Sequence, residues 1–259
     1  RKMSFEIKEL AKIKVKNPVL IEGLPGIGNV GKIAVDFMID SLKAKKFLEV
    51  YSNSFPNSVF INENNLITLP KISLHYKKAR NKDLIFLAGD VQPIDEKSCY
   101  DFCEIILSIF KKHKGREIIT LGGIGLPKIP KEPRIFCTAN NNNIVKKYKT
   151  KELNDKIFGT VGPIIGVTGL LIGLAEKYKI QSIALLAETF NHPNYLGLRG
   201  ADQILKLLNK KLELRLNLKE LEEEIENIEE EIKVNAKKLN KDKIIEVEKL
   251  LNEKTSYIG

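Results

Sequence analysis

The 259-residue chain contains no tryptophan, and phenylalanine and tyrosine together make up only 7% of it. Proteins that bind single-stranded nucleic acid stack bases on aromatic side chains, so this chain offers few such platforms. Its formal net charge of +10 comes mostly from lysines, which occur in nearly every segment beside abundant glutamate and isoleucine. That distribution is typical of the surface of a heat-adapted protein rather than of a nucleic-acid-binding patch. We therefore expect no nucleic-acid partner.

Cysteine is also scarce. Cys99, Cys103 and Cys137 are an odd number, and no secretory leader precedes them, so we expect a cytoplasmic protein without a disulfide framework. Cys99 and Cys103 lie four residues apart, but no Cys-x-x-Cys or His-x-x-x-His pair completes a metal site. We expect these cysteines in an apolar core, and we expect no bound metal and no cofactor.

Long apolar runs are absent as well. A membrane-spanning helix needs about 18 or more consecutive apolar residues. The longest candidate, Val161–Leu174, is interrupted by Pro163 and by four glycines. We therefore expect no membrane contact.

Short apolar segments of strand length alternate with segments of helical periodicity. The strand-like segments are 19–22, 47–51, 84–88, 117–121, 134–138 and 183–187. The helix-like segments are 32–42, 96–112, 143–149, 168–178 and 201–208. Such alternation is typical of an α/β fold in which helices cover both faces of a largely parallel sheet. We expect one such domain over residues 1–211.

Residues 58–77 break this alternation. Asn62-Glu63-Asn64-Asn65 is typical of a turn that joins two short strands, and Leu69-Pro70 leads into a third strand. The segment is therefore predicted to be an antiparallel insertion or an extension of the sheet.

Glycine and proline disappear after residue 211 until the last residue, and apolar residues then recur at heptad spacing. The predicted seam consists of Leu218, Leu221, Ile225, Ile228, Ile232, Asn235 and Leu239. A narrow seam with one polar position is typical of a coiled-coil-like helix that pairs with another, so residues 212–253 are predicted to form a homo-oligomerisation region. Acidic residues concentrate in 222–231 and lysines follow them, which favours an antiparallel partner. A helix folded back onto its own domain remains an alternative, and the number of subunits stays open.

Gly26, Gly28 and Gly31 follow the first strong strand and match Gly-x-Gly-x-x-Gly, the spacing of dinucleotide-binding turns. That function also needs an acidic residue at the tip of the next strand to hold a ribose. Glu49 lies inside the strand pattern instead, and Gly23-Leu24-Pro25 lengthens the turn. A nucleotide-binding regulator therefore remains only an alternative.

Several polar residues follow the carboxyl ends of predicted strands, where α/β sheets usually place ligands. The candidate ligand crevice consists of Glu22, Gly26, Gly28, Asp90, Gln92 and Glu188. Glu188 and His192 have the chemistry of an acid and a base, but no Ser or Cys lies in a nucleophile turn. We therefore favour helix caps and loop ties over catalysis, and we expect no catalytic residue.

Five segments taken together resemble the archaeal branch of the proteasome assembly chaperone family. They are 22–31, 89–93, 120–125, 165–171 and 186–189, and they span most of residues 19–208. The resemblance implies a phosphorylase/hydrolase-like three-layer α/β sandwich that needs no catalytic centre. It also implies a homo-oligomer whose flexible tail, residues 254–259, docks on the proteasome α-ring or its α-subunits.

The last residues depart from the family's tail, which ends in a hydrophobic residue, a tyrosine and any final residue. Here Ser256, Tyr257, Ile258 and Gly259 place the tyrosine third from the end. Either this tail docks differently or another partner is bound. Several tails on one oligomer would gain avidity on a ring, so a weak single tail would suffice.

The leading hypothesis is thus a non-enzymatic, ATP-independent proteasome assembly chaperone or proteasome-binding adaptor. The alternatives are an enzyme of the nucleoside phosphorylase or hydrolase type that uses the crevice, and the nucleotide-binding regulator.

Overall fold

A computed structural model describes residues 5–79, 82–159, 161–223 and 225–227. The chain divides into one unit over residues 1–216 and a second over residues 217–259.

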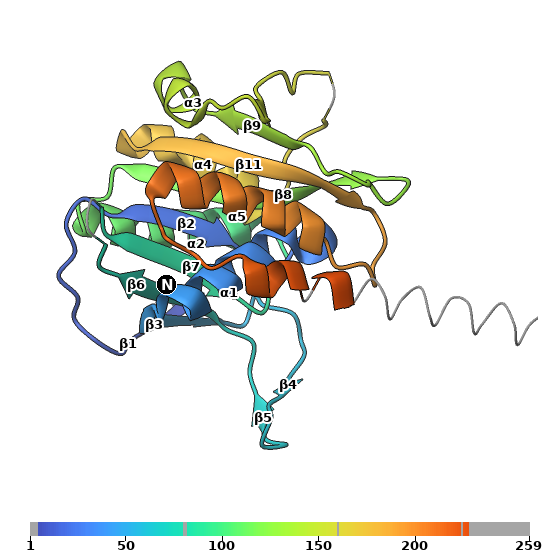
Figure 1. The fold of residues 1–259 in the computed structure, drawn as a ribbon. Helices are drawn as coiled ribbons and strands as arrows, with labels where there is room; N and C mark the ends of the chain where they lie inside the picture. The colour runs from blue at the N-terminus through green and yellow to red at the C-terminus, as the bar shows by residue number, and fades with distance from the viewer. Residues whose placement is uncertain (1–4, 80–81, 160, 224, 228–259) are drawn as a thin grey trace, which may run out of the picture. The chain divides into compact units, whose positions relative to one another are not determined.

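A nine-stranded sheet forms the centre of the first unit (Figure 1). Its strands, in spatial order, are β1 (Phe5–Glu9), β3 (Lys45–Ser52), β6 (Ile72–Lys77), β7 (Leu84–Gly89), β2 (Val19–Gly23), β8 (Glu117–Leu126), β11 (Gln181–Phe190), β9 (Ile135–Ala139) and β10 (Leu153–Asn154). The four central strands β7, β2, β8 and β11 run parallel. Antiparallel pairs join them to the flanking strands on both sides. Strands β2 and β7 are buried along their whole length, which explains their continuous apolar sequences.

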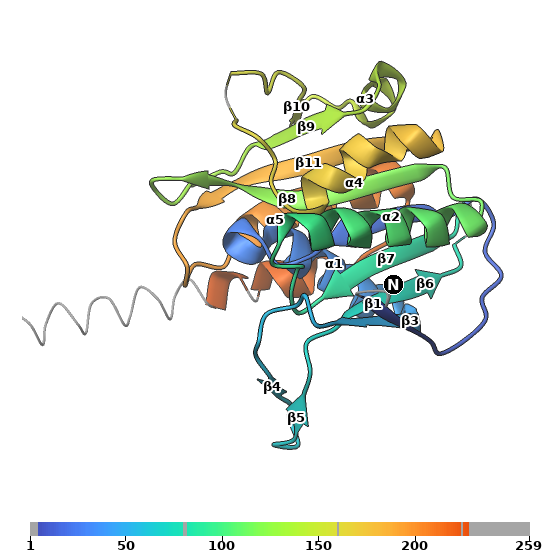
Figure 2. The ribbon, with the colours of Figure 1, turned by 180° about the vertical axis from the view of Figure 1, so that it is seen from behind.

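Helices cover both faces of this sheet (Figures 1 and 2). They are α1 (Val30–Leu42), α2 (Glu96–Lys112), α3 (Asn142–Tyr148), α4 (Val167–Ala175) and α5 (Leu198–Leu212), with the short 3₁₀ helices η1 (Ile27–Asn29) and η2 (Glu176–Tyr178). Helices α1 and α5 pack together on one face, and α2 and α4 pack together on the other. The predicted three-layer α/β sandwich with a mostly parallel central sheet is therefore confirmed.

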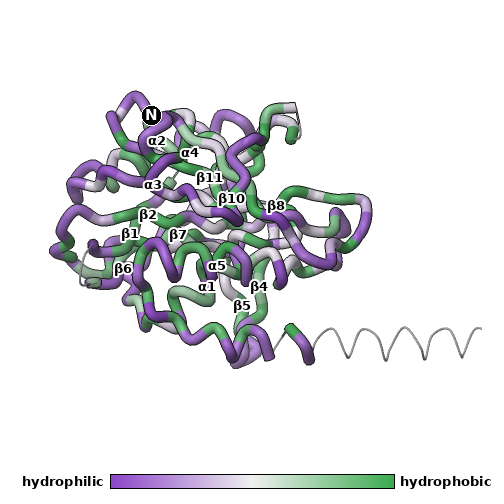
Figure 3. Tube along the Cα trace, turned by 45° about the horizontal axis from the view of Figure 1, so that its top comes forward, coloured by the Kyte–Doolittle hydropathy of each residue, from purple (hydrophilic) through white to green (hydrophobic). Residues whose placement is uncertain are grey.

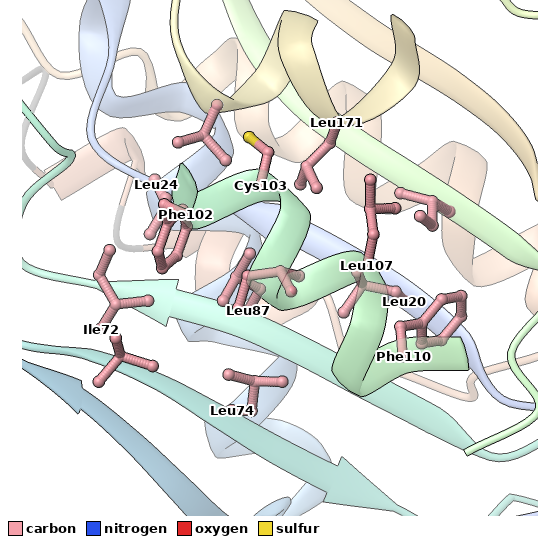
Figure 4. Close-up of a cluster of buried hydrophobic side chains, with 14 of the residues drawn as sticks. Leu20, Leu24, Ile72, Leu74, Leu87, Phe102, Cys103, Leu107, Phe110 and Leu171 are labelled. Carbon is pink, nitrogen blue, oxygen red and sulfur yellow. The ribbon is translucent and has the colours of Figure 1, made fainter. Parts of the chain in front are cut away.

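A large hydrophobic core lies between the sheet and the α2–α4 layer (Figure 4). Phe102, Cys103, Leu107 and Phe110 recur at three- and four-residue spacing along α2, which places them on one face of that helix. Figure 4 shows these side chains against apolar residues of the strands and against Leu171 of α4. All three cysteines of the chain are free and buried, as the sequence predicts.

Hydropathy follows the layers, since hydrophobic residues concentrate along the inner strands and hydrophilic residues along the outer loops (Figure 3). Within the described residues, no helix has the length and apolarity that crossing a membrane would require.

The predicted insertion forms two structures. A separate antiparallel hairpin of β4 (Phe60–Ile61) and β5 (Ile67–Thr68) projects from the sheet in both ribbon views, and β6 then joins the main sheet (Figures 1 and 2). The side chain of Asn62 builds the turn, because its Oδ1 accepts hydrogen bonds from the backbone N–H of Asn64 and of Leu66, both at 3.0 Å. The antiparallel character predicted for residues 58–77 is confirmed.

Only the start of the second unit is described. Residues 219–223 and 225–227 are helical, and they include Leu221 and Ile225 of the predicted seam. Leu218 immediately precedes them, and its backbone carbonyl accepts a hydrogen bond from the N–H of Glu222 at 3.0 Å. The other seam positions (Ile228, Ile232, Asn235 and Leu239) and the tail (Ser256, Tyr257, Ile258 and Gly259) lie outside the described residues. The pairing seam and the docking tail thus stay predictions.

Candidate functional site

A crevice of about 510 Å³ lies at the carboxyl ends of β2 and β8. Its walls are the glycine-rich turn after β2, residues 121–125 of β8, and residues 161–165 with Thr168 at the start of α4. Leu24, Ile27 and Leu186 make much of the lining apolar. Among the sequence-predicted crevice residues, Gly26 and Gln92 line this space directly.

The glycines of the turn make room mainly for other parts of the protein. A Cβ on Gly31 would lie 2.2 Å from the carbonyl oxygen of Leu121, so this glycine lets α1 pack directly against β8. Gly28 has a φ of +60°, and a Cβ there would lie 2.6 Å from Oγ1 of Thr189. Gly26 alone of the three faces open space, since a Cβ there would have nothing within 4 Å. The spacing therefore serves close packing of a helix on a strand.

The start of α1 is covered rather than open to a phosphate. Gly197, in the segment before α5, donates its backbone N–H to the carbonyl of Gly28 at 2.7 Å. A Cβ on Gly197 would lie 2.5 Å from Cγ2 of Val30, which shows how closely this segment covers the first turn of the helix. Glu49, the nearest match to a ribose-binding acid, lies in β3 and accepts hydrogen bonds from Lys46, Lys71 and Tyr51. This arrangement disfavours the dinucleotide-binding interpretation.

Glu22 lies beneath the crevice at the end of β2 and is fully buried. Its Oε1 accepts hydrogen bonds from the N–H of Leu24 at 3.1 Å and from the hydroxyl of Thr168 at 3.4 Å, and both partners line the crevice. Within the described residues, its Oε2 and the buried hydroxyl of Thr120, opposite it on β8, have no hydrogen-bond partner. Burial raises the pKa of Glu22 to about 8, so the group is largely protonated at neutral pH.

Gln92 ties two walls of the crevice together. Its Nε2 donates to the carbonyl of Pro25, and its Oε1 accepts from the N–H of Val167 at 3.0 Å. The amide thus connects the glycine-rich turn to the first residue of α4. This is the loop-tying role that the sequence favours over catalysis.

The structure places the other two predicted acids elsewhere. Asp90 borders a separate depression beside Lys32 of α1, Lys71 and His75. Glu188 is buried and accepts three hydrogen bonds from Arg134, one from the backbone N–H at 3.0 Å and two from the guanidinium. Although its burial acts in the opposite direction, these hydrogen bonds hold the pKa of Glu188 below its usual range. Gly26 and Gln92 therefore line the crevice and Glu22 lies beneath it. The other three predicted residues, Gly28, Asp90 and Glu188, are not part of its lining.

The structure does not pair His192 with Glu188 as a base and an acid. Its ring stacks on Phe190, with the ring centroids 5.5 Å apart, and its Nδ1 accepts a hydrogen bond from the N–H of Asn194 at 3.3 Å. Arg134 supplies the hydrogen bonds that Glu188 accepts. Glu188 and His192 are only four residues apart in the sequence, but in the structure their side chains have different partners.

A buried carboxylate at the opposite end of the sheet was not predicted from the sequence. Glu117, the first residue of β8, accepts hydrogen bonds from Tyr148 and Lys147 and from Lys82 at 3.2 Å. Although burial opposes the change, these partners lower the pKa of Glu117. They come from separate segments of the chain, so the only signal in the sequence is an acid at the start of an apolar strand. We assign this cluster to stability.

These features define an α/β-sandwich protein with a small, mostly apolar crevice whose polar groups hold its walls together. Within the described part of the chain, no group of three His, Cys, Asp or Glu side chains is placed to hold a metal ion. The model of the PAC2 family matches residues 20–236, and the chain belongs to this family.

The chain is also similar to solved structures and to sequence relatives over most of its length. The crystal structure of Pyrococcus furiosus PbaB, described as an archaeal proteasome activator, is 31% identical and aligns with a TM-score of 0.83 over 90% of this chain and 99% of that chain. PbaA of the same organism, described as an archaeal homolog of proteasome-assembly chaperone, aligns with a TM-score of 0.70 at 25% identity over 88% and 95% of the two chains. MJ1210 of Methanocaldococcus jannaschii is 30% identical over 234 residues, which cover 88% of each chain.

Proposed function

We propose that this chain is a non-enzymatic, ATP-independent proteasome assembly chaperone or proteasome-binding activator. It acts as a homo-oligomer and docks its C-terminal tail on the proteasome α-ring. The observation that carries the proposal is the similarity to PbaB, which extends over 99% of that chain at 31% identity. Membership of the PAC2 family and the similarity to PbaA support the same role.

The geometry of the crevice supports a role without catalysis. Glu22 bonds to the walls of the crevice, Gln92 ties two of these walls together, and Glu188 bonds to Arg134. A general acid or base must lie within hydrogen-bond reach of the substrate. Here the buried carboxylates are separated and their hydrogen bonds serve the fold.

The proposed docking element is the tail Ser256–Gly259. A ring presents several equivalent sites, so an oligomer that carries several tails would bind far more tightly than one tail alone. This avidity is how a tail with Tyr257 third from the end would still work. Linker geometry must then allow several tails to engage at once.

Deletion of Ser256–Gly259 tests the docking proposal. We expect the shortened protein to lose binding to purified α-rings in a pull-down and to keep the wild-type mass in sedimentation, because the deletion leaves the predicted seam intact. Tyr257→Ala should weaken binding while Thr255→Ala, the matched control in the same segment, should not. A tail-deleted protein that still binds α-rings would overturn the tail as the docking element.

The same pull-down with isolated α-subunits in place of rings distinguishes an assembly chaperone from an activator of finished rings. Binding to free subunits favours the chaperone, and binding to rings alone favours the activator. If the wild-type protein binds neither, the proposed function is wrong.

A further inference from the structure

The β4–β5 hairpin carries a dense group of exposed apolar side chains. Six of the large hydrophobic residues exposed in the described part of the chain lie between positions 59 and 69. They are Val59, Phe60, Ile61, Leu66, Ile67 and Leu69. Ile61 and Ile67 are 73% and 71% exposed, although isoleucine is one of the residue types most often buried. Contiguous exposed apolar surface of this kind marks an interaction site.

The strand register gathers part of this surface on one side of the hairpin. Ile61 and Ile67 lie directly opposite each other in the β4–β5 pair. Val59 and Leu69 are the apolar residues two positions before Ile61 and two positions after Ile67, just outside the strands. We call these four residues the aliphatic face.

The aliphatic face continues into a hollow at the base of the hairpin. Val59 and Leu69 line a concavity of about 1130 Å³, together with Phe55 on its apolar side and with the charged residues Glu6 and Lys8 of β1. The hairpin therefore forms the apolar wall of an open space whose other lining residues are partly polar. The concavity offers room for a projecting segment of another molecule.

The charge distribution limits what this segment can be. Between Asn53 and Pro70 the only charged residue is Glu63, which lies in the hairpin turn, while the whole chain has a formal net charge of +10. An acidic partner would be attracted to the lysine-rich surfaces and not to this uncharged one. Two copies of the chain repel each other across most of their surfaces, so they approach most easily where lysines are few, as on the hairpin and in a concavity whose one lysine, Lys8, is matched by Glu6. The aliphatic face of a second copy is a suitable partner, because it is equally apolar and because it brings no like charge into the contact.

The hairpin is preorganised although it has no core of its own. Asn62 fixes the turn through its side chain, and its backbone N–H donates to the carbonyl of Leu66 at 2.9 Å. An isolated two-stranded hairpin is marginally stable in water, so covering its apolar face stabilises it. The hydrogen bonds that already form the turn reduce the conformational entropy that the hairpin loses on binding.

We propose that the aliphatic face and the concavity form a two-fold interface with a second copy of this chain, in which the hairpin of each copy lies in the concavity of the other. Such an isologous contact buries the same residues on both copies and needs no additional partner. The inference rests on the proposed function, because it gives the proposed homo-oligomer one of its contacts.

The double variant Ile61→Asp/Ile67→Asp in the full-length protein tests this interface. Both side chains are exposed, so the change should leave the fold intact while it places up to four carboxylates in the contact of two copies. We expect sedimentation to show a smaller assembly, and an increase of about 100-fold or more in the dissociation constant of the two-fold contact, because the substitutions remove its central apolar side chains. Ile129→Asp/Ile165→Asp, at positions 57% and 85% exposed, is the matched control and should keep the wild-type mass.

A cross-linking measurement gives an independent result. A mixture of Ile67→Cys with Asn57→Cys, an exposed position in the concavity, should form an intermolecular disulfide under mild oxidation, since the two-fold contact places the hairpin of one copy in the concavity of the other. The native cysteines are buried and should not react, and Ile129→Cys is the exposed control. A wild-type mass for the double aspartate variant, or no cross-link through Cys at position 67, would overturn the interface.

The two proposals fail in different ways. If the aspartate variant keeps its mass and the wild-type protein binds α-rings through its tail, only the hairpin interface is wrong. If the aspartate variant becomes smaller but the wild-type protein binds neither rings nor α-subunits, the interface stands and the proteasome role is wrong.

Discussion

Glu22 makes the stability of the fold depend on pH through one carboxyl group. Burial raises its pKa from 4.5 to about 8, so between these values the folded protein holds a proton that the unfolded chain has released. The free energy of unfolding therefore falls as pH rises through this interval and levels off above it. This is the opposite of a salt-bridged carboxylate such as Glu117, whose lowered pKa stabilises the fold above pH 4.5 and loses that effect as pH falls.

We expect Glu22→Gln, which keeps the shape of the side chain but cannot ionise, to remove this dependence. Between about pH 5 and pH 8, the unfolding equilibrium constant of the wild type should rise relative to that of the variant by about tenfold per pH unit. Urea unfolding at several pH values measures the effect, and Glu63→Gln, at an exposed position in the hairpin turn, is the control. Parallel pH profiles for the wild type and Glu22→Gln would contradict the prediction.

The surroundings of Glu22 show what the sequence could not reveal about single residues. Its position at the end of a strand was predicted correctly. Its hydrogen-bond partner Thr168 lies 146 residues away in the sequence, so its complete burial depends on how α4 packs over the sheet. In the same way, Arg134 and not His192 became the partner of Glu188, because pairing of β9 with β11 brings residue 134 alongside.

At the scale of elements, substitutions at Gly31 and Gly26 distinguish a packing role of the glycine-rich turn from a ligand-binding role. Gly31→Ala would place a methyl group 2.2 Å from the carbonyl of Leu121 and push α1 away from β8. We expect overpacking to lower the free energy of unfolding by about 3 kcal/mol and the better helix propensity of alanine to raise it by about 1 kcal/mol. The net loss of stability is then about 2 kcal/mol.

Gly26→Ala is the matched variant in the same turn. Nothing lies within 4 Å of the added methyl group, so the free energy of unfolding should change by less than about 0.5 kcal/mol. Denaturant unfolding of both variants makes the comparison. If Gly26→Ala destabilises the protein as much as Gly31→Ala does, the turn is not organised by packing of α1 on β8.

The long periodic elements were predictable, and the errors have physical causes. The bounds of α2 were predicted correctly because seven buried residues follow helical spacing along its 17 residues. The sequence pattern ended β8 at Leu121, because Gly122 and Gly123 are typical of a turn, whereas pairing with β11 carries the strand on to Leu126. Strand β1 was not predicted, because only Phe5 of its five residues is buried and the segment lacks a continuous apolar run.

At the scale of the whole molecule, the structure disfavours the alternative that this protein is a nucleotide-binding regulator. The start of α1 is covered by the segment around Gly197, and Glu49 is bonded to two lysines and a tyrosine. A ligand that binds the native state must stabilise it against heat. We therefore expect saturating NAD⁺ or ATP to leave the melting temperature unchanged in a thermal-shift measurement. A clear rise with either compound would revive the nucleotide-binding regulator.

The family could be predicted from the order of five short segments, whereas the contacts of the assembly could not. A heptad seam is compatible with several subunit arrangements. The hairpin was predicted as a local structure, but only the structure shows that Ile61 and Ile67 remain exposed on it. The sequence shows that side chains are apolar, and the fold decides which of them are left for a partner.

The two borders of the central sheet limit how copies of this protein can accumulate. The outer strand β1 exposes Glu6, Lys8 and Glu9, and the border strand on the other side, β10, is only two residues long. Neither border is a good template for an incoming strand, so the sheet should not grow from molecule to molecule into fibrils. Copies that meet through a reciprocal hairpin contact use up that surface on both sides, so this contact by itself joins two copies and no more.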